Sequence, residues 1–541
     1  MIKLKQKHSL ILAALSSLLL ILPWLQQFSG VILFVAFIPL LVIEHNLYES
    51  RQNNKSIQIF IYAYLIFFIW NFATTYWIYN ATIAGAIAAI LLNSLFMALV
   101  IWLFHITHRL LGHRYGYFGL ITYWTGFELL YLKADISWPW LNLGNGLAKD
   151  IKLIQWIEFT GITSATPWIL LINILLFTII LEYAEKLNIR KKIFELIILL
   201  VVALLPIGFS IYKYHSYNES NDPFEITILQ PNIDPYNEKP TKLTNQEKLD
   251  IILDLANSNV DLETEYVIAP EAAIEDNIWE NNLPNNRSIK RINEFVKSYP
   301  DLKFIVGMQS LYSYQPDEPP SSTARKFSDS DGMWDLYNSS IQIDNSNNFQ
   351  VYHKSKLVIG VEKMPSGKVF KILEKVITKF GGASGSYGTQ NERNTLNDPI
   401  GNGKVGTLIC YESVYGEFVT DYIKKGANML FIITNDGWWG NTLGYKQHLS
   451  YSGLRAIETR RSIARSASTG ISCFINQKGE ISMQTEYGKK SAIEAYINAN
   501  SKLTYYVKHG NFISRILLFF GILTLLYTIA KLLMGRKLLK P

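Results

Sequence analysis

The sequence predicts a polytopic α-helical membrane domain of about eight helices joined to a water-exposed α/β domain. Hydrophobic residues make up 49% of the 541 residues, and charged residues make up 18%, below the roughly 25% of a soluble domain. Long apolar runs lie at the two ends of the chain, whereas the middle alternates strand-like and helix-like stretches. These observations exclude an ordinary soluble enzyme and a disordered chain. Two cysteines are too few for a disulfide framework or a cysteine-based zinc site.

Apolar runs that are long enough, or nearly long enough, to cross a bilayer divide the chain into three parts. The runs are residues 9–27, 29–44, 57–77, 83–107, 117–133, 164–184, 193–213 and 511–531. We therefore expect a membrane domain with seven helices over 1–213 and a large water-exposed domain over 214–508. A last membrane helix with a short tail should occupy 509–541.

Lysine and arginine mark one side of the membrane, which is the cytoplasmic side in bilayer proteins. Fifteen of them lie in the loops 1–8, 46–56, 108–116, 185–192 and 531–541. The loops of the other side carry three, all within 133–163. Both termini are therefore expected in the cytoplasm and the 214–508 domain outside it. Topology accounts for most of the net charge of +7, so nucleic acid is not expected as a partner.

The 214–508 domain is predicted to be α/β, because strand-like stretches alternate with helix-like ones. The expected strands are 225–230, 265–269, 304–309, 337–344, 349–354, 405–410, 429–434 and 471–476. The expected helices are 244–257, 287–298, 413–425 and 445–464. A polar stretch rich in Pro and Ser, 312–333, is expected on the surface.

Cys410 ends an apolar strand and is followed by a helix-like stretch. A thiol at such an elbow lies at the edge of the sheet, and a helix N-terminus behind it would stabilise the thiolate. The alternative is a buried free cysteine that serves as a small apolar side chain. Cys473 lies inside ISCFIN with no elbow after it, and is expected in the core.

A cysteine nucleophile needs a base and a group that stabilises an oxyanion. Glu271 comes directly after an apolar strand, where a carboxylate is costly without a partner, and Lys354 ends another strand. Either residue alone also fits a solvated strand end, and His448 is expected to be structural or on the surface. The series strand–Glu, strand–Lys, strand–Cys is more informative, because sites in α/β folds assemble at the C-terminal ends of strands.

This series resembles the Glu–Lys–Cys triad of the nitrilase (carbon–nitrogen hydrolase) superfamily. The sequences PEAA, YHKSKLV and ICYES match its three landmarks in order, and NDGWWG (435–440) matches as well. With seven spans before the domain and one after it, the chain resembles the bacterial apolipoprotein N-acyltransferase family. The sequence departs from that family at Ala269, where the family has tryptophan, and at LVIGVE (357–362), where it has LVPFGE.

The resemblance implies an α-β-β-α sandwich and a two-step acyl transfer. The implied site residues are the triad Glu271, Lys354 and Cys410, with Tyr411, Glu362 and Glu412 in support. Glu271 would take the proton of Cys410, which would carry the acyl group as a thioester. The implied partners are a phospholipid donor and a lipoprotein whose N-terminal cysteine carries a diacylglyceryl group. The implied place is the bacterial inner membrane with the catalytic domain in the periplasm, without a cofactor or a metal.

Candidate lipid contacts are Trp438 and Trp439 in NDGWWG, and Phe370 and Ile377 in the segment 368–380. That segment has apolar residues at helical spacing on one face and lysines on the other, which is typical of a helix at a lipid interface. It is expected to be either a lid at the membrane surface or an ordinary surface helix.

Two other functions stay open at this point. A membrane-anchored amidase or nitrilase that hydrolyses a small amide would use the same triad, and differs in delivering water to the thioester. A non-enzymatic membrane scaffold would have an unreactive Cys410.

Overall fold

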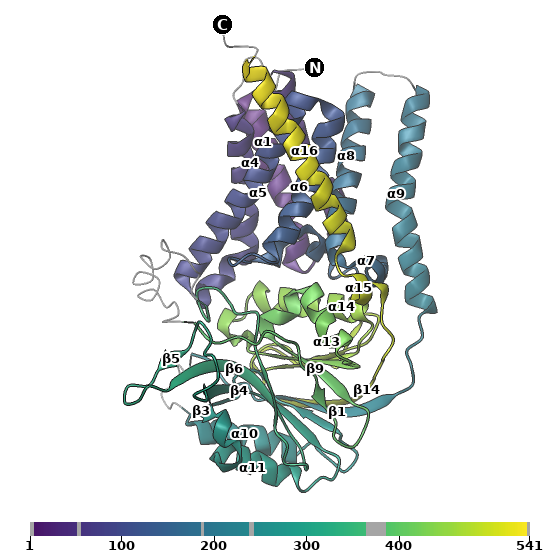
Figure 1. Ribbon diagram of the computed structural model, residues 1–541. Helices are drawn as coiled ribbons and strands as arrows, with labels where there is room; N and C mark the ends of the chain where they lie inside the picture. The colour runs from purple at the N-terminus through teal and green to yellow at the C-terminus, as the bar shows by residue number, and fades with distance from the viewer. Residues whose placement is uncertain (1–4, 51–55, 185–188, 237–242, 364–385, 538–541) are drawn as a thin grey trace. The chain divides into compact units, whose positions relative to one another are not determined.

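The computed structural model describes residues 5–50, 56–184, 189–236, 243–363 and 386–537. The chain divides into two compact units (Figure 1). One unit, here called the membrane unit, contains residues 1–76, 86–216 and 509–541. The other, the α/β unit, contains residues 217–508 together with the short segment 77–85.

The membrane unit is helical. Its helices are α1 (Gln6–Ile21), α2 (Leu33–Ala36), α3 (Ile38–Glu49), α4 (Ile57–Thr75), α5 (Ile83–Leu111), α6 (His113–Tyr131), α7 (Ile157–Thr160), α8 (Ala165–Ala184), α9 (Ile189–Ser216) and α16 (Phe512–Lys537). Within the described ranges, seven helical stretches are long and apolar enough to cross a membrane. The expectation of a multi-pass membrane protein is therefore confirmed.

The expected span at 117–133 forms helix α6, but it is not one of those seven stretches. Its sequence, HRYGYFGLITYWTGFELLY, mixes Tyr, Trp, Thr and Gly with fewer aliphatic residues, which lowers its hydropathy. Its one acidic side chain, Glu128, is buried and hydrogen-bonded. The buried carboxylate of Glu128 accepts hydrogen bonds from Trp124 Nε1 at 3.0 Å, Leu143 N at 2.8 Å and Thr166 Oγ1 at 2.5 Å.

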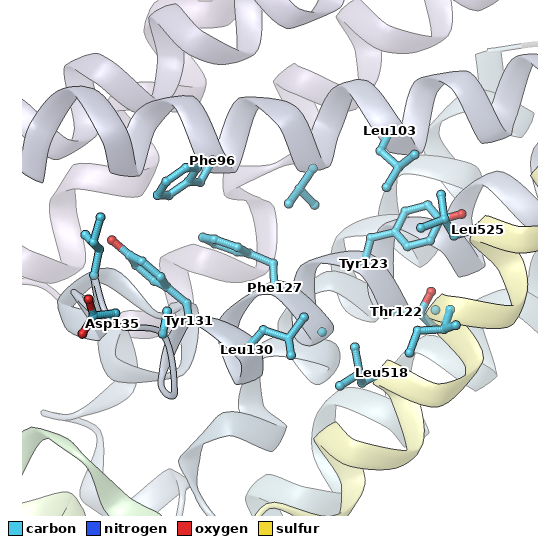
Figure 2. A pocket seen from close by; sticks show the side chains of 16 residues that line it. Phe96, Leu103, Thr122, Tyr123, Phe127, Leu130, Tyr131, Asp135, Leu518 and Leu525 are labelled. Atoms are coloured by element: carbon cyan, nitrogen blue, oxygen red, sulfur yellow. The ribbon is translucent and has the colours of Figure 1, made fainter. Parts of the chain in front are cut away.

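Helices α5, α6 and α16 border an apolar groove of about 650 Å³ (Figure 2). The labelled side chains that line it include Phe96 and Leu103 of α5, Phe127 and Leu130 of α6, and Leu518 of α16. Two glycines let α6 and α16 pack closely beside the groove. A Cβ at Gly126 would lie 3.0 Å from Leu518 Cδ1, and one at Gly521 would lie 3.2 Å from the Thr122 carbonyl oxygen.

The α/β unit contains two mixed sheets. The first has the strand order β14-β1-β2-β4-β6-β5, with β3 paired to β4 and β7 paired to β6. Its strands are β1 (Pro223–Gln230), β2 (Tyr266–Ile268), β3 (Ile274–Trp279), β4 (Lys303–Ser313), β5 (Arg325–Lys326), β6 (Met333–Ile343), β7 (Gln350–His353) and β14 (Ser491–Asn498). The second has the order β13-β12-β11-β10-β9-β8. Its strands are β8 (Leu396–Asn397), β9 (Lys404–Ile409), β10 (Met429–Thr434), β11 (Ile463–Ala467), β12 (Cys473–Ile475) and β13 (Ile481–Ser482).

Helices cover the outer faces of both sheets, which gives the expected α-β-β-α arrangement (Figure 1). Helices α10 (Asn245–Asn257) and α11 (Arg287–Val296) pack on the first sheet, and α13 (Gly416–Lys424) and α14 (Leu443–Thr459) pack on the second. A short helix, α15 (Tyr505–His509), follows β14. The core between the sheets joins residues such as Ile226 and Ile268 of the first to Leu408 and Ile432 of the second. Parallel pairing of β9, β10 and β11 brings their C-terminal ends to one edge.

Candidate active site

Glu271 lies just beyond β2 and is only 6% exposed. Its Oε1 accepts hydrogen bonds from Lys354 Nζ and Asn338 Nδ2, both at 2.8 Å, and its Oε2 accepts one from the Asn435 backbone N–H at 3.0 Å. Gly307 on β4 makes room for this turn, since a Cβ there would lie 2.6 Å from Glu271 Cα. The carboxylate is therefore fixed by three donors from three different segments.

Lys354 follows β7 and is 1% exposed. Its backbone N–H donates to the Asn338 carbonyl at 2.8 Å. Its ammonium lies 2.8 Å from Glu271 Oε1 and 2.8 Å from Glu362 Oε1. Burial alone would lower the pKa of Lys354, but the charges of Glu271 and Glu362 outweigh it and hold that pKa well above its usual value. The side chain is therefore a permanent cation.

Cys410 stands at the turn after β9 with a left-handed backbone, φ +52°. It is 5% exposed and begins a 3₁₀ segment of five residues, Cys410–Val414. Burial and the charge of Glu271 raise the pKa of the Cys410 thiol well above its usual value, and Lys354 opposes them. The sequence predicted a helix directly behind this thiol, but the 3₁₀ segment comes first and α13 begins only at Gly416. The 3₁₀ segment is short, and burial is the largest influence on the pKa of Cys410, so the environment favours the protonated thiol.

Glu412 ties the turn that carries Cys410 to the turn that carries Lys354. Its Oε1 accepts from Tyr352 Oη and Ser355 N, both at 2.7 Å, and its Oε2 accepts from Ile409 N at 2.9 Å. Burial raises the pKa of Glu412, and these three hydrogen bonds oppose the rise. Tyr411, next to it, is buried with its ring edge-on to Tyr415 at 5.2 Å.

The two candidate tryptophans have different surroundings. Trp438 is 39% exposed, and its ring packs on Tyr236 with the centroids 5.3 Å apart. Trp439 packs on Trp77 at 5.0 Å and on His448 at 5.3 Å. The other two candidate lipid contacts, Phe370 and Ile377, lie outside the described residues together with the whole segment 368–380.

Asn338 was not predicted from the sequence, and of the two roles expected for His448, structural or on the surface, the structural one fits. Asn338 on β6 donates from Nδ2 to both Glu271 at 2.8 Å and Glu362 at 2.9 Å. An asparagine inside an otherwise buried strand was the available signal, because a buried amide needs partners. His448 is fully buried and contacts the Cys410 backbone, so it is not a surface residue. Cys473 lies in the core as expected, and burial raises the pKa of Cys473 to about 12.

Two parts of the chain match described families. Residues 16–175 match the apolipoprotein N-acyltransferase N-terminal domain, and residues 321–502 match carbon–nitrogen hydrolase. The apolipoprotein N-acyltransferase of Chlorobaculum tepidum is 27% identical over 512 residues, which cover 92% of this chain and 92% of that relative. That of Geobacter metallireducens is 24% identical over 519 residues, covering 93% of this chain and 92% of the relative. The chain belongs to the apolipoprotein N-acyltransferase family.

This member of the apolipoprotein N-acyltransferase family carries Lys354, Glu362 and Cys410 inside the carbon–nitrogen hydrolase match, whereas Glu271 precedes it. Among solved structures, a nitrilase-superfamily protein of Saccharomyces cerevisiae aligns with 14% identity and a TM-score of 0.37, covering 52% of this chain and 93% of its own.

Proposed function

We propose that this protein moves an acyl chain from a phospholipid to the N-terminal amine of a diacylglyceryl-cysteine lipoprotein, through a thioester at Cys410. The observation that carries the proposal is the buried Lys354 ammonium between Glu271 and Glu362, beside a thiol at a left-handed turn. Membership of the family supports the lipoprotein as acceptor. A chain with seven candidate spans suits a donor and an acceptor that both sit in a bilayer.

In the first half of the reaction, Glu271 takes the proton from Cys410 Sγ, and the thiolate attacks the ester carbonyl carbon of the phospholipid. The oxygen of the tetrahedral intermediate carries the negative charge, which the Lys354 ammonium stabilises. When the intermediate collapses, the C–O bond breaks, and the leaving alkoxide takes the proton from Glu271. The products are an acyl thioester on Cys410 and a lysophospholipid.

In the second half, the neutral amine of the acceptor attacks the thioester carbonyl, and Glu271 takes one proton from the amine. Collapse breaks the C–S bond, forms the amide and returns the proton to Cys410. A thioester divides one difficult transfer into two easier ones. Glu412 supports both halves by joining the turns that carry the cysteine and the lysine, and the backbone N–H of Tyr411 is a further oxyanion donor.

The loop charges support a matching orientation in the bacterial inner membrane. Both termini lie in the cytoplasm in this proposal, and the α/β unit lies in the periplasm, where lipid-anchored proteins are exposed.

The test is intact-mass spectrometry of the purified protein in phospholipid vesicles. We expect a mass increase of one fatty acyl group that is removed by hydroxylamine and absent in Cys410→Ser. Addition of a synthetic diacylglyceryl-cysteine peptide should discharge it with formation of an amide. Discharge to free fatty acid at the same rate with or without the peptide would favour a hydrolase. Absence of any adduct on a folded protein would favour a scaffold.

A further inference from the structure

The carbonyl oxygen of Cys410 is held by two side chains. Ser413 Oγ donates to it at 2.8 Å, and His448 Nε2 lies 3.1 Å from it. A carbonyl oxygen only accepts, so this contact is a hydrogen bond in the tautomer that carries its proton on Nε2. Ser413 belongs to the same turn, but His448 comes from α14, 38 residues further along the chain. His448 therefore ties the left-handed turn of Cys410 to a long helix that packs on the second sheet.

The other ring nitrogen of His448 faces a buried ion pair. Nδ1 lies 3.2 Å from Arg465 Nη2 and 3.1 Å from Asp436 Oδ1, and Arg465 Nη2 donates to Asp436 Oδ2 at 2.6 Å. Burial and the charge of Arg465 lower the pKa of His448, which favours the neutral ring. A neutral ring carries one proton. With that proton on Nε2, Nε2 donates to the Cys410 carbonyl and Nδ1 accepts from Arg465, and this is the tautomer that the inference below uses.

Trp439 contacts the ring of His448, and Trp77 packs against Trp439. The ring of Trp439 meets the imidazole edge-on, with centroids 5.3 Å apart, and Trp77 packs on Trp439 at 5.0 Å. Trp77 is 1% exposed and lies against the first turn of α14, one turn before His448. Gly444 allows Trp77 to pack this closely on α14, because a Cβ there would lie 2.7 Å from the Trp77 ring.

Trp77 begins the segment 77–85, the connection between α4 and α5, which groups with the α/β unit. Hydrogen bonds fix this segment to the loop of Trp439. Asn80 Nδ2 donates to the Trp439 carbonyl at 2.8 Å. The Tyr236 hydroxyl lies 2.6 Å from the Asn80 carbonyl oxygen and 2.7 Å from that of Trp438.

We propose that His448 is a positioning residue for Cys410, and that Trp77 holds His448 in place through Trp439. A connection between two membrane helices thereby sets the geometry of the nucleophile. The inference rests on the proposed function for its kinetic readout, but the placement of the Cys410 thiol is measurable without any lipid substrate.

The first test compares three substitutions of His448 in the full-length protein. His448→Gln retains an N–H near the Nε2 position, whereas His448→Asn is too short and His448→Leu has no donor. We expect His448→Leu and His448→Asn to slow thioester formation by about 10²-fold, as for a nucleophile misplaced by about 1 Å. The KM for phospholipid should stay within about twofold, because His448 acts through Cys410 and not on the lipid. His448→Gln should restore most of the rate.

The second test concerns the tryptophans. Trp77→Ala should slow thioester formation in the same direction as His448→Leu, and Trp77→Phe should recover much of the loss because a ring still covers Trp439. Trp334→Ala is the matched control. Trp334 is half-buried against Trp279 and Phe327 in the same unit, and its loss should leave the rate unchanged.

A lipid-free readout separates this inference from the proposed function. In a Cys473→Ser background, iodoacetamide should alkylate Cys410 more slowly in His448→Leu and Trp77→Ala than in the parent protein. That difference is expected even if no phospholipid adduct ever forms.

If folded His448→Leu forms the thioester and is alkylated at the same rates as the parent protein, His448 has no positioning role. Equal losses in His448→Gln and His448→Asn would also overturn that role. Normal rates in Trp77→Ala would overturn the role of Trp77. If His448→Leu does not fold, the Gln and Asn variants decide.

Discussion

Lys354 Nζ and Glu271 Oε1 lie 2.8 Å apart in the interior of the α/β unit, although 83 residues separate them in the sequence. This contact links the cation of the site to the proposed base. When Glu271 takes a proton from Cys410, the negative charge moves from the carboxylate to sulfur, and the ammonium then faces a thiolate. Since the pKa of Lys354 is held well above its usual value, the lysine keeps its charge throughout. Glu362 supplies the carboxylate that stays ion-paired with it.

Replacing the two cysteines separately should identify the nucleophile. We expect Cys410→Ser to abolish the acyl adduct, because a serine hydroxyl is a far weaker nucleophile in the same place. Cys473→Ser should retain most of the adduct, since Cys473 is buried in β12. Peptide mapping of the adduct by mass spectrometry is the measurement. An acyl group on Cys473, or full activity in Cys410→Ser, would contradict the assignment.

The titration of Cys410 should move in opposite directions when its two charged neighbours are neutralised. Burial and then Glu271 raise the pKa of the thiol, whereas Lys354 lowers it. Glu271→Gln should therefore lower the pH at which Cys410 becomes a thiolate, and Lys354→Met should raise it. The rate of alkylation by iodoacetamide as a function of pH measures both shifts. If the pKa of Cys410 shifts in the same direction in both variants, Glu271 and Lys354 do not have opposite effects on the thiol, and the prediction is wrong.

Thioester formation should fail in both variants, whichever way the thiol titrates. Glu271→Gln lacks the base, so the more acidic thiol should still form no adduct at neutral pH. Lys354→Met should slow the step about 10²–10³-fold through the lost oxyanion donor. It should also cost about 3–5 kcal/mol of unfolding free energy, since it leaves Glu271 and Glu362 buried without their cation. Single-turnover mass spectrometry and thermal unfolding report the two effects. Rapid adduct formation in Glu271→Gln would exclude Glu271 as the base.

The sequence predicts the parallel strands well, because strands buried on both faces read as apolar runs. The expected strands 405–410 and 429–434 correspond to β9 and β10. The expected helix 445–464 was partly wrong. Helix α14 ends at Thr459, Arg460 adopts a left-handed conformation with φ +51°, and β11 begins at Ile463. Arg465 on that strand is fully buried, and a pattern of hydrophobicity cannot show an arginine in a core.

The site was predictable only in part for a related reason. Glu271, Lys354 and Cys410 each follow the C-terminal end of a strand, which is a local feature of the sequence. The partners that hold them are not local. Asn338 and His448 reach the site from a strand and a helix whose pairing depends on the whole fold, and neither stands in a motif that names its partner.

Gly307 offers a test of how closely the site depends on the packing of β4. In Gly307→Ala the new Cβ would lie 2.6 Å from Glu271 Cα, so the turn that carries the base must shift. We expect a loss of about 1–3 kcal/mol in unfolding free energy and slower thioester formation. Gly332→Ala is the control, because its Cβ would meet side-chain atoms and no backbone, namely the edge of the Phe327 ring at 3.1 Å and Ser330 Oγ at 3.5 Å. If the two variants have the same unfolding free energy and the same rate of thioester formation, the position of Glu271 does not depend on close packing at Gly307.

The orientation in the membrane can be tested by cysteine labelling of intact cells with a membrane-impermeant maleimide. The natural cysteines, Cys410 and Cys473, are buried, so they give a low background. Ser330→Cys in the α/β unit and Arg114→Cys at the start of α6 both place a thiol at an exposed position. Since Lys and Arg gather in the loop that contains Arg114, we expect Ser330→Cys to label in intact cells and Arg114→Cys only after lysis. The reverse pattern would put the α/β unit in the cytoplasm. It would also remove the acyl transfer proposed here, because a diacylglyceryl-lipoprotein on the outer face could not then reach Cys410.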